Sequence, residues 1–298
     1  MARTLGACGL AIVAATGVAC AVNVDHEGHI QREDQRFAAT GVVDLHLYTF
    51  DGAIEVRSWD RSEVLVEVEK RGQDPEAVSK IEVVTDRTRD RIQVEARHPG
   101  SGGVFIGIGR FTSPSAKIIA SVPRRTNVVV RSGDGALLVE RVEGRLELRT
   151  DDGTITVVET SGELLAESRD GRILLDEVTG RIEARTSDGS VRLSGTPATV
   201  RARSGDGSVV LRLRSGTKMA GDWMVATDDG SISVEVPDGF SAMVEADPGR
   251  DGRVRSELTL AETTGGTREQ RVLRGRLGDG GYLFTLRTGD GTIALTNY

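Results

Sequence analysis

Residues 146–157 read Leu-Glu-Leu-Arg-Thr-Asp-Asp-Gly-Thr-Ile-Thr-Val, and this stretch decides the fold. Apolar and polar residues alternate on both sides of an Asp-Gly pair, which is typical of two half-buried strands joined by a tight turn. The pattern returns as Leu-Leu-Ala-Glu-Ser-Arg-Asp-Gly-Arg-Ile-Leu-Leu at residues 164–175 and as Ile-Glu-Ala-Arg-Thr-Ser-Asp-Gly-Ser-Val-Arg-Leu at residues 182–193. One strand–turn–strand unit therefore recurs every 18 residues.

The Asp-Gly pair marks this unit along much of the chain. It recurs at 18-residue intervals four times in succession, resumes after an insertion of five residues, and returns near the C-terminus. A fixed period of this kind indicates a repeat architecture, in which each unit buries its apolar face against its neighbours. The pairs are Asp134-Gly135, Asp152-Gly153, Asp170-Gly171, Asp188-Gly189, Asp206-Gly207, Asp229-Gly230 and Asp290-Gly291.

The apolar positions predict how the units stack. They lie two and four residues after each glycine, and the strand before each pair alternates in the same way. Period two means a strand with one buried face. Eighteen residues then bring the chain back to its start, displaced by one strand spacing of about 4.8 Å. The sequence predicts an all-β protein, a single-stranded parallel β-solenoid (β-helix) of about 18 residues per rung with equivalent residues stacked in columns.

Small hydroxylated residues precede each turn. The residue two before each aspartate is Ser132, Thr150, Ser168, Thr186, Ser204, Thr227 or Thr288. We expect these hydroxyls to hydrogen-bond along a column and the turn glycines to take the positive φ that a tight turn needs. The structural turn glycines are Gly135, Gly153, Gly171, Gly189, Gly207, Gly230 and Gly291.

The stacked aspartates also allow a metal hypothesis. Carboxylates about 5 Å apart repel each other, and a bound calcium ion would relieve this repulsion. The calcium-binding β-roll pattern has a nine-residue period with more glycine than this chain carries, so the structural interpretation is favoured. The calcium ladder would consist of Asp134, Asp152, Asp170, Asp188 and Asp206.

The N-terminus resembles an export signal. Arg3 precedes an apolar run from Leu5 to Ala19, which is shorter than the roughly 20 residues that span a bilayer. Residues 17–20 resemble a lipobox that would make Cys20 the acylated first residue of a lipoprotein. Release of a soluble chain near Val22 and an uncleaved anchor are the alternatives. Cysteine occurs only at positions 8 and 20, so the rest of the chain has no disulfide and no thiolate zinc site.

Five segments follow from these patterns. Residues 1–20 are the signal peptide, and residues 21–40 are a tether or a first edge strand. Residues 41–127 are an irregular N-terminal β region or cap, with a short helix at Asp74–Lys80 where Asp74 is the N-cap. Residues 128–240 hold the regular repeats. Residues 241–298 form an irregular excursion, with a hairpin from residues 254–260 and 270–277, and a last rung at residues 284–295.

One apolar segment interrupts the N-terminal region. Val104, Phe105, Ile106 and Ile108 are flanked by glycines. They form either a projecting contact surface or a strand buried against the body, and the buried strand is favoured.

Composition and motifs argue against several function classes. With 38 Lys and Arg against 45 Asp and Glu, the chain has a net charge of −7, whereas a nucleic-acid binder normally has a basic face. No Ser-His-Asp arrangement, phosphate loop or zinc motif is present. The acid pairs Asp151-Asp152 and Asp228-Asp229 are the only support for a parallel β-helix polysaccharide lyase or hydrolase. We therefore expect no enzyme and no cofactor.

Two stretches resemble a known family. Residues 50–60 read Phe-Asp-Gly-Ala-Ile-Glu-Val-Arg-Ser-Trp-Asp and residues 64–71 read Val-Leu-Val-Glu-Val-Glu-Lys-Arg. Together with the Asp-Gly units up to residue 295, they resemble the bacterial DUF4097 family, whose members are described as candidate adhesins. The resemblance covers roughly residues 40–298. It implies an exported protein, often a lipoprotein, with a right-handed β-helix-like fold, and for some members an association with envelope stress. It implies no catalytic residues.

The function expected from the sequence is therefore non-enzymatic. The leading hypothesis is an exported envelope scaffold or adhesin that binds a surface ligand of unknown identity and touches the membrane only through a lipid anchor. The alternative is an envelope-stress protein that recognises a peptide or a glycan.

Overall fold

Each 18-residue unit folds into two strands and two bends, which confirms the predicted all-β solenoid. The computed structural model describes residues 19–25, 28–98, 113–264 and 271–298. The regular strands are β9 (Thr126–Ser132), β10 (Leu137–Glu140), β11 (Glu143–Thr150), β12 (Ile155–Val158), β13 (Ser161–Ser168), β14 (Ile173–Arg185), β15 (Val191–Ser204), β16 (Val209–Leu213), β17 (Trp223–Thr227) and β18 (Ile232–Val236). The handedness of the coil stays a prediction.

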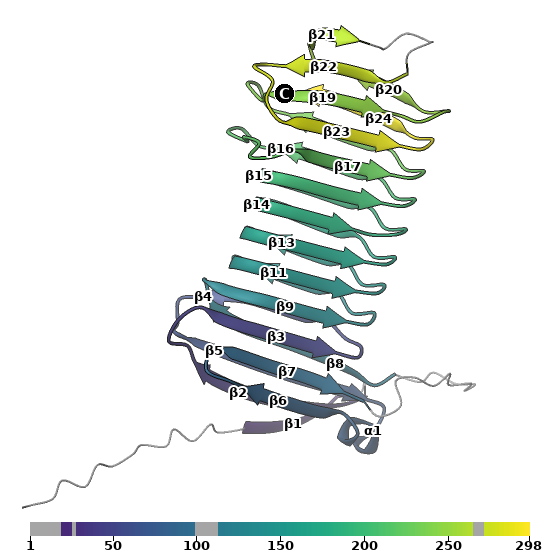
Figure 1. Ribbon diagram of the computed structural model, residues 1–298. Coiled ribbons are helices and arrows are strands. Elements are labelled where there is room, and N and C mark those ends of the chain that lie inside the picture. The colour runs from purple at the N-terminus through teal and green to yellow at the C-terminus, as the bar shows by residue number, and fades with distance from the viewer. Residues whose placement is uncertain (1–18, 26–27, 99–112, 265–270) are drawn as a thin grey trace, which may run out of the picture.

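The strands stack in parallel to form two ladders that face each other (Figure 1). The front ladder contains β9, β11, β13, the second halves of β14 and β15, and β17. The back ladder contains β10, β12, the first halves of β14 and β15, β16 and β18. Inward residues pair in strict sequence at 18-residue intervals, as Leu137, Ile155, Ile173, Val191 and Val209 do. All five are at most 1% exposed, so the space between the ladders is a dry core.

The turn glycines adopt a different conformation from the one predicted. None of the seven, all of which lie in the described ranges, has a positive φ, so the expected conformational reason is wrong. They are required because the turns are stacked very closely. A β-carbon on Gly171 would lie 1.9 Å from the carbonyl oxygen of Gly153 in the rung below, and the other turn glycines are equally confined.

Positive φ occurs instead at the second bend of each rung. Arg141, Glu159 and Glu177 have φ values of 57°, 52° and 51°. The glycines three residues later, Gly144 and Gly162, have φ values of 154° and 124°. Left-handed backbone at this bend turns the chain from the back ladder to the front ladder.

The C-terminal rung lies inside the stack and not at its end. Its strands are β23 (Leu283–Thr288) and β24 (Thr292–Asn297). β23 pairs with β17 on one side and with β19 (Ala242–Asp247) on the other. β24 likewise lies between β18 and β20 (Arg253–Ser256). The prediction of a last rung that ends the coil at residues 284–295 is therefore wrong.

The predicted C-terminal hairpin is correct only in part. β21 (Ala261–Thr264) pairs antiparallel with β22 (Leu273–Leu277), and β22 pairs antiparallel with β19. β20, which contains Val254, instead continues the back ladder in parallel with β24. The reason is that alternating residues at 253–256 complete a rung with β19, as they would in a regular unit.

The N-terminal end repeats the same arrangement. β3 (Val43–Thr49) and β4 (Ile54–Trp59) pair with β9 and β10 and so form the first rung of the stack. Beyond them lie β7 (Arg91–Arg97) and β6 (Glu82–Arg87) on the front ladder. On the back ladder lie β8 (Ser115–Pro123), β5 (Glu63–Gly72), β2 (Gly28–Ala38) and β1 (Ala19–Asp25). Of the two expectations for residues 21–40, a tether or an edge strand, the structure has strands.

The predicted short helix is present as α1 (Pro75–Ser79). The Asp74 carboxylate accepts a hydrogen bond from the Ala77 N–H at 2.7 Å, which is the N-cap that the sequence indicated. Val78 of this helix is buried, so the helix packs onto the strands at this end of the stack.

Some predictions fall outside the described residues. These are the signal segment up to residue 18 and the apolar segment with Val104, Phe105, Ile106 and Ile108. Cys20 lies in β1, and its lipidation stays a prediction. In the described ranges, no helix combines the length and the apolar composition needed to cross a membrane.

Candidate functional site

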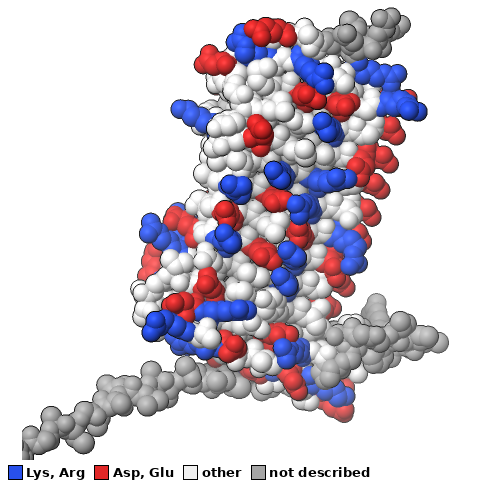
Figure 2. Space-filling model, in the orientation of Figure 1, with Lys and Arg blue, Asp and Glu red and all other residues white. Residues whose placement is uncertain are grey.

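The outward side of the front ladder, called here the front face, carries linked ion pairs. Arg131 contacts Glu147 at 3.0 Å, and Arg149 lies between Glu147 at 3.3 Å and Glu167 at 3.1 Å. Arg185 continues the series by contacting Glu167 at 3.0 Å. Because equivalent residues stack rung on rung, each arginine reaches carboxylates on its own or a neighbouring strand. Figure 2 shows the two signs of charge interspersed over this face.

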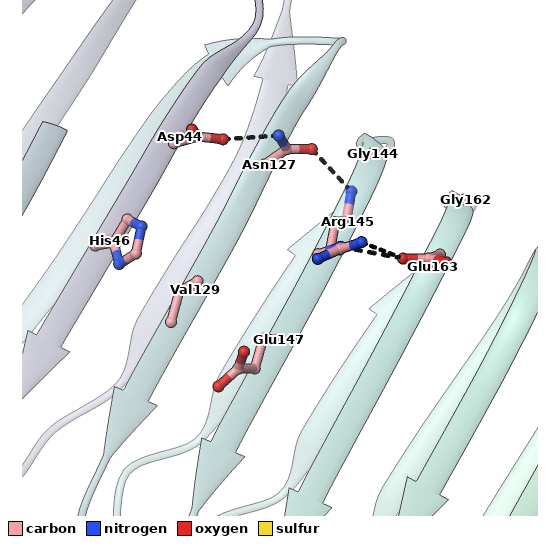
Figure 3. A pocket seen from close by; sticks show the side chains of 9 residues that line it. All are labelled: Asp44, His46, Asn127, Val129, Gly144, Arg145, Glu147, Gly162 and Glu163. Atoms are coloured by element: carbon pink, nitrogen blue, oxygen red, sulfur yellow. Dashed lines mark hydrogen bonds and ion pairs between the residues drawn. The ribbon is translucent and has the colours of Figure 1, made fainter. Parts of the chain in front are cut away.

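A second polar row runs along the starts of the same strands. Asn127 donates from its side-chain nitrogen to the Asp44 carboxylate at 2.7 Å and accepts from the backbone N–H of Arg145 at 3.0 Å. The Arg145 guanidinium in turn donates to Glu163 at 3.0 Å. Figure 3 shows these contacts running from β3 across β9 and β11 to β13. The row is therefore held by direct bonds between four successive strands.

A shallow depression of about 710 Å³ lies beside these polar side chains (Figure 3). Asp44, Asn127, Arg145 and Glu163 line it together with His46 and Glu147, and Val129 contributes an apolar surface. Gly144 and Gly162 also line it. These glycines belong to the second bend, so the conformation that turns each rung also removes side chains that would fill the space.

His46 is the titratable group of the depression with a shifted pKa. Burial lowers the pKa of His46, and the positive charge of Arg91 lowers it further. Its Nδ1 lies 3.0 Å from the Tyr48 hydroxyl. A neutral imidazole offers one donor and one acceptor. Since the described residues that line the depression include three carboxylates and a single guanidinium, it suits a neutral or cationic ligand rich in hydrogen-bonding groups.

The predicted aspartate column is in file along the edge of the stack. Consecutive turns are bonded to each other, as the N–H groups of Asp170 and Asp188 show by donating to carbonyls of the rung below at 3.1 Å. Their carboxylates point to solvent, and Figure 2 shows acidic side chains along this edge. Within the described part of the chain, no three His, Cys, Asp or Glu side chains gather to hold a metal ion. The calcium hypothesis gains no support from this geometry.

The hydroxyl column forms other bonds than those predicted. Its members, which all belong to described strands, bond to the backbone and not to one another. Thr150 donates to the carbonyls of Gly133 and Gly135 at 2.8 and 3.0 Å, and it accepts from the N–H of Gly153 at 3.3 Å. The same arrangement recurs at Ser168, Thr186 and Thr227. Each buried hydroxyl thus ties one turn to the turn below it.

The acid pairs proposed for catalysis lie in exposed ion pairs. Asp151 contacts Arg169 at 3.0 Å, and Asp228 contacts Arg203 at 3.2 Å. Neither pair lines the depression. The geometry therefore gives no positive support for a polysaccharide lyase or hydrolase.

Comparison with known proteins identifies the family. The model of the Toastrack DUF4097 family matches residues 42–296. The chain belongs to the Toastrack DUF4097 family. No curated protein matches the chain. The resemblance stated from the sequence is thereby confirmed for the family and the fold.

Solved structures with a similar course are distant from this Toastrack protein. A candidate adhesin of Bacteroides fragilis shares 9% identity, with 90% of this chain and 97% of that chain covered and a TM-score of 0.42. A candidate lipid binding protein of Parabacteroides distasonis shares 12% identity, with coverage of 89% and 96% and a TM-score of 0.42. A candidate cell adhesion protein of Clostridium sporogenes shares 11% identity, with coverage of 90% and 100% and a TM-score of 0.32.

The sequence analysis of this Toastrack protein did not find the depression. Asp44 and Asn127 are 83 residues apart in the chain, and only the pairing of β3 with β9 brings them together. The one available signal was the second glycine of each unit, at Gly144 and Gly162, which indicates missing side chains on a strand face. It could not indicate which residues surround the space.

Proposed function

We propose that this Toastrack protein is a non-enzymatic, exported scaffold of the cell envelope that adheres to a surface ligand through its front face. The observation that carries the proposal is the open polar depression on a rigid stack of paired strands. A rigid face loses little conformational freedom when it binds, because its polar groups are already fixed by their neighbours. Residues 1–20 support export, and Cys20 supports attachment through a lipid.

The lining of the depression supports a glycan as the ligand. The carboxylates of Asp44 and Glu163, the amide of Asn127 and the guanidinium of Arg145 offer donors and acceptors at fixed positions. Such groups can bond to adjacent hydroxyls of a saccharide. Val129 gives a small apolar surface for the carbon side of a ring. The surplus of carboxylates disfavours strongly acidic polymers, so a neutral or amino sugar fits best.

Titration calorimetry with soluble chitin and peptidoglycan fragments tests this proposal. Asn127→Ala and Arg145→Ala are each expected to weaken binding about tenfold, which corresponds to about 1.4 kcal/mol. Arg212→Ala is the matched control, because Arg212 forms a similar exposed ion pair with Glu235 at 2.6 Å on the back ladder. No binding of any fragment, or an equal loss in the control, would contradict the proposal.

A second candidate function is recognition of a cationic peptide as part of an envelope-stress response. The three carboxylates against one guanidinium among the described lining residues support it. In this case, deletion of the gene changes the sensitivity of cells to cationic envelope-active peptides and leaves attachment to surfaces unchanged. Loss of attachment without a change in sensitivity favours adhesion instead.

The place of action has its own test. Mass spectrometry of the mature protein from cells is expected to find a diacylated or triacylated Cys20 as the first residue. An unmodified start near Val22 would replace the lipid anchor by soluble export, and an intact residue 1 would indicate an uncleaved anchor.

A further inference from the structure

The Asp-Gly pair is chemically reactive as well as structurally useful. The backbone nitrogen of the glycine can attack the side-chain carbonyl carbon of the aspartate, because no glycine side chain hinders the approach. A bond forms between this nitrogen and the carboxyl carbon, while the carboxyl hydroxyl leaves as water with the amide proton. Water then opens the five-membered imide at either carbonyl and yields aspartate or isoaspartate. The net change is an isomerisation that needs only water.

Seven of these pairs hold the glycine nitrogen away from the aspartate. In each, the glycine N–H donates to the hydroxyl of the Ser or Thr three residues earlier, at 3.0 to 3.3 Å. These Ser and Thr residues are at most 9% exposed, whereas the aspartate side chains point to solvent. The attacking nitrogen therefore faces the interior and the reactive carboxyl faces outward. The glycines are Gly135, Gly153, Gly171, Gly189, Gly207, Gly230 and Gly291.

The hydroxyls are themselves fixed. Thr186 donates to the carbonyls of Arg169 and Gly171, both at 3.1 Å, while it accepts from Gly189. Rotating the Gly189 amide toward the Asp188 carboxyl would leave this buried hydroxyl without its donor. A buried polar group that loses its partner without gaining water is strongly disfavoured, so the reactive geometry is rarely reached in the folded chain.

Asp51-Gly52 has the same position in the first rung but a different geometry. The Thr49 hydroxyl donates to the carbonyls of Asp51 and Ala116, both at 3.0 Å. The Gly52 N–H bonds instead to the carboxyl of Asp51, so the two reacting groups are in contact. Gly52 also has a φ of 121°, unlike the seven glycines above. Burial and the nearby charge of Asp134 raise the pKa of Asp51, which increases the neutral form that can lose water.

We propose that the buried hydroxyl column protects seven Asp-Gly bonds from isomerisation and leaves Asp51 as the position in this column where isoaspartate forms in the folded protein. Isoaspartate adds one methylene group to the backbone. At Gly52 the next turn is stacked so closely that a β-carbon on Gly135 would lie 1.8 Å from the Gly52 carbonyl oxygen. The modification therefore loosens the joint between the first rung and the regular stack.

Peptide mapping of the aged, folded protein tests the proposal. The full chain is incubated for weeks in mildly acidic buffer well below its melting temperature, and isoaspartate is located by electron-transfer fragmentation. We expect at least ten times more isoaspartate at Asp51 than at Asp170 or Asp188. Asp238-Gly239 is the internal reference, because a β-carbon at Gly239 would meet nothing within 4 Å and no stacked turn confines this pair. Equal amounts at Asp51 and Asp170, or none at Asp51 while Asp238 reacts, would overturn the proposal.

A variant pair tests the hydroxyl directly. Thr186→Val keeps the shape of the side chain and removes the acceptor, so isoaspartate at Asp188 is expected to rise at least fivefold. Thr186→Ser keeps the acceptor and is expected to match the parent protein. Circular dichroism confirms that both variants are folded during the incubation. If folded Thr186→Val leaves Asp188 unreacted, the hydroxyl is not the protecting group, and the comparison of Asp51 with Asp170 tests the proposal even if this variant does not fold.

Discussion

At the scale of single residues, the turn glycines matter for the space they leave empty. In each regular rung the position that a side chain would occupy faces the carbonyl oxygen of the glycine below it. The glycine column and the hydroxyl column therefore act together, because the close approach of successive turns is what brings each hydroxyl within bonding distance of the lower carbonyl.

Gly171→Ala is expected to destabilise the protein by about 2–4 kcal/mol, because the new β-carbon would lie 1.9 Å from the Gly153 carbonyl oxygen and the backbone must move to admit it. Gly41→Ala is the matched control. A β-carbon at Gly41 meets nothing within 4 Å, so its effect is expected to stay within about 0.5 kcal/mol. Urea unfolding measures both, and similar losses in the two variants would contradict the stacking argument.

His46 gives the depression a pH dependence. Burial and Arg91 lower the pKa of His46 from its usual 6.5. Below that pH the unfolded chain takes up a proton more readily than the folded chain, so this contribution to stability is lost as the pH falls. His46→Gln is therefore expected to lose less melting temperature than the parent protein between about pH 7.5 and about pH 5.5. An equal loss in both proteins would show that His46 does not titrate with folding.

At the scale of elements, β23 joins parts of the chain that are far apart in sequence. Leu286 in its centre pairs with Val225 of β17 and with Ala246 of β19. Phe284 of the same strand packs against Trp223 and Phe240, with ring centres 5.3 and 6.4 Å away. One strand thus covers the apolar surface of two neighbours.

Leu286→Ala is expected to cost about 2–5 kcal/mol, since Leu286 is fully buried and the deletion leaves a cavity. Hydrogen exchange is expected to speed up in both β17 and β19. Leu283→Ala on the same strand is the control, because Leu283 is 39% exposed. Loss of protection in β17 alone would mean that β19 does not depend on β23.

The regular elements could be predicted from the sequence, and the order of the end elements could not. Period-two patterns and Asp-Gly turns at 18-residue spacing define each rung locally, so β10 to β16 follow from the chain itself. The position of β23 between β17 and β19 depends on pairing between segments 61 residues apart, such as Trp223 and Phe284. The depression was not predicted for the same reason, because Asp44 reaches Asn127 only through the pairing of β3 with β9. Turn location was predictable, whereas the reason for each glycine depends on the neighbouring rung.

At the scale of the whole molecule, the stack is nearly one-dimensional, since each rung contacts mainly the rungs on either side. Removing one whole period should therefore leave a shorter protein of the same kind. Removing one residue fewer should instead place outward side chains inside, because a slip of one residue reverses the faces of a strand.

Deletion of residues 157–174, which is one period of 18 residues, joins Thr156 to Leu175 and keeps the inward positions in phase. This variant is expected to fold cooperatively and to be shorter by about 4.8 Å. Deletion of residues 157–173 places Asp176 at an inward position and is expected to abolish folding. Circular dichroism and small-angle X-ray scattering distinguish the two, and equal folding of both would contradict the register argument.

The intercalated C-terminal rung has a consequence for biosynthesis. The last residues to leave the ribosome or the export channel are those that separate β17 from β19. Until they arrive, β17 and β18 lack their next neighbours, and residues 242–256 have no parallel partner. A chain that terminates early therefore lacks an internal layer and keeps two unpaired strand edges, which invite proteolysis and aggregation. Only a completely synthesised copy can close this gap, so folding itself discriminates against truncated molecules.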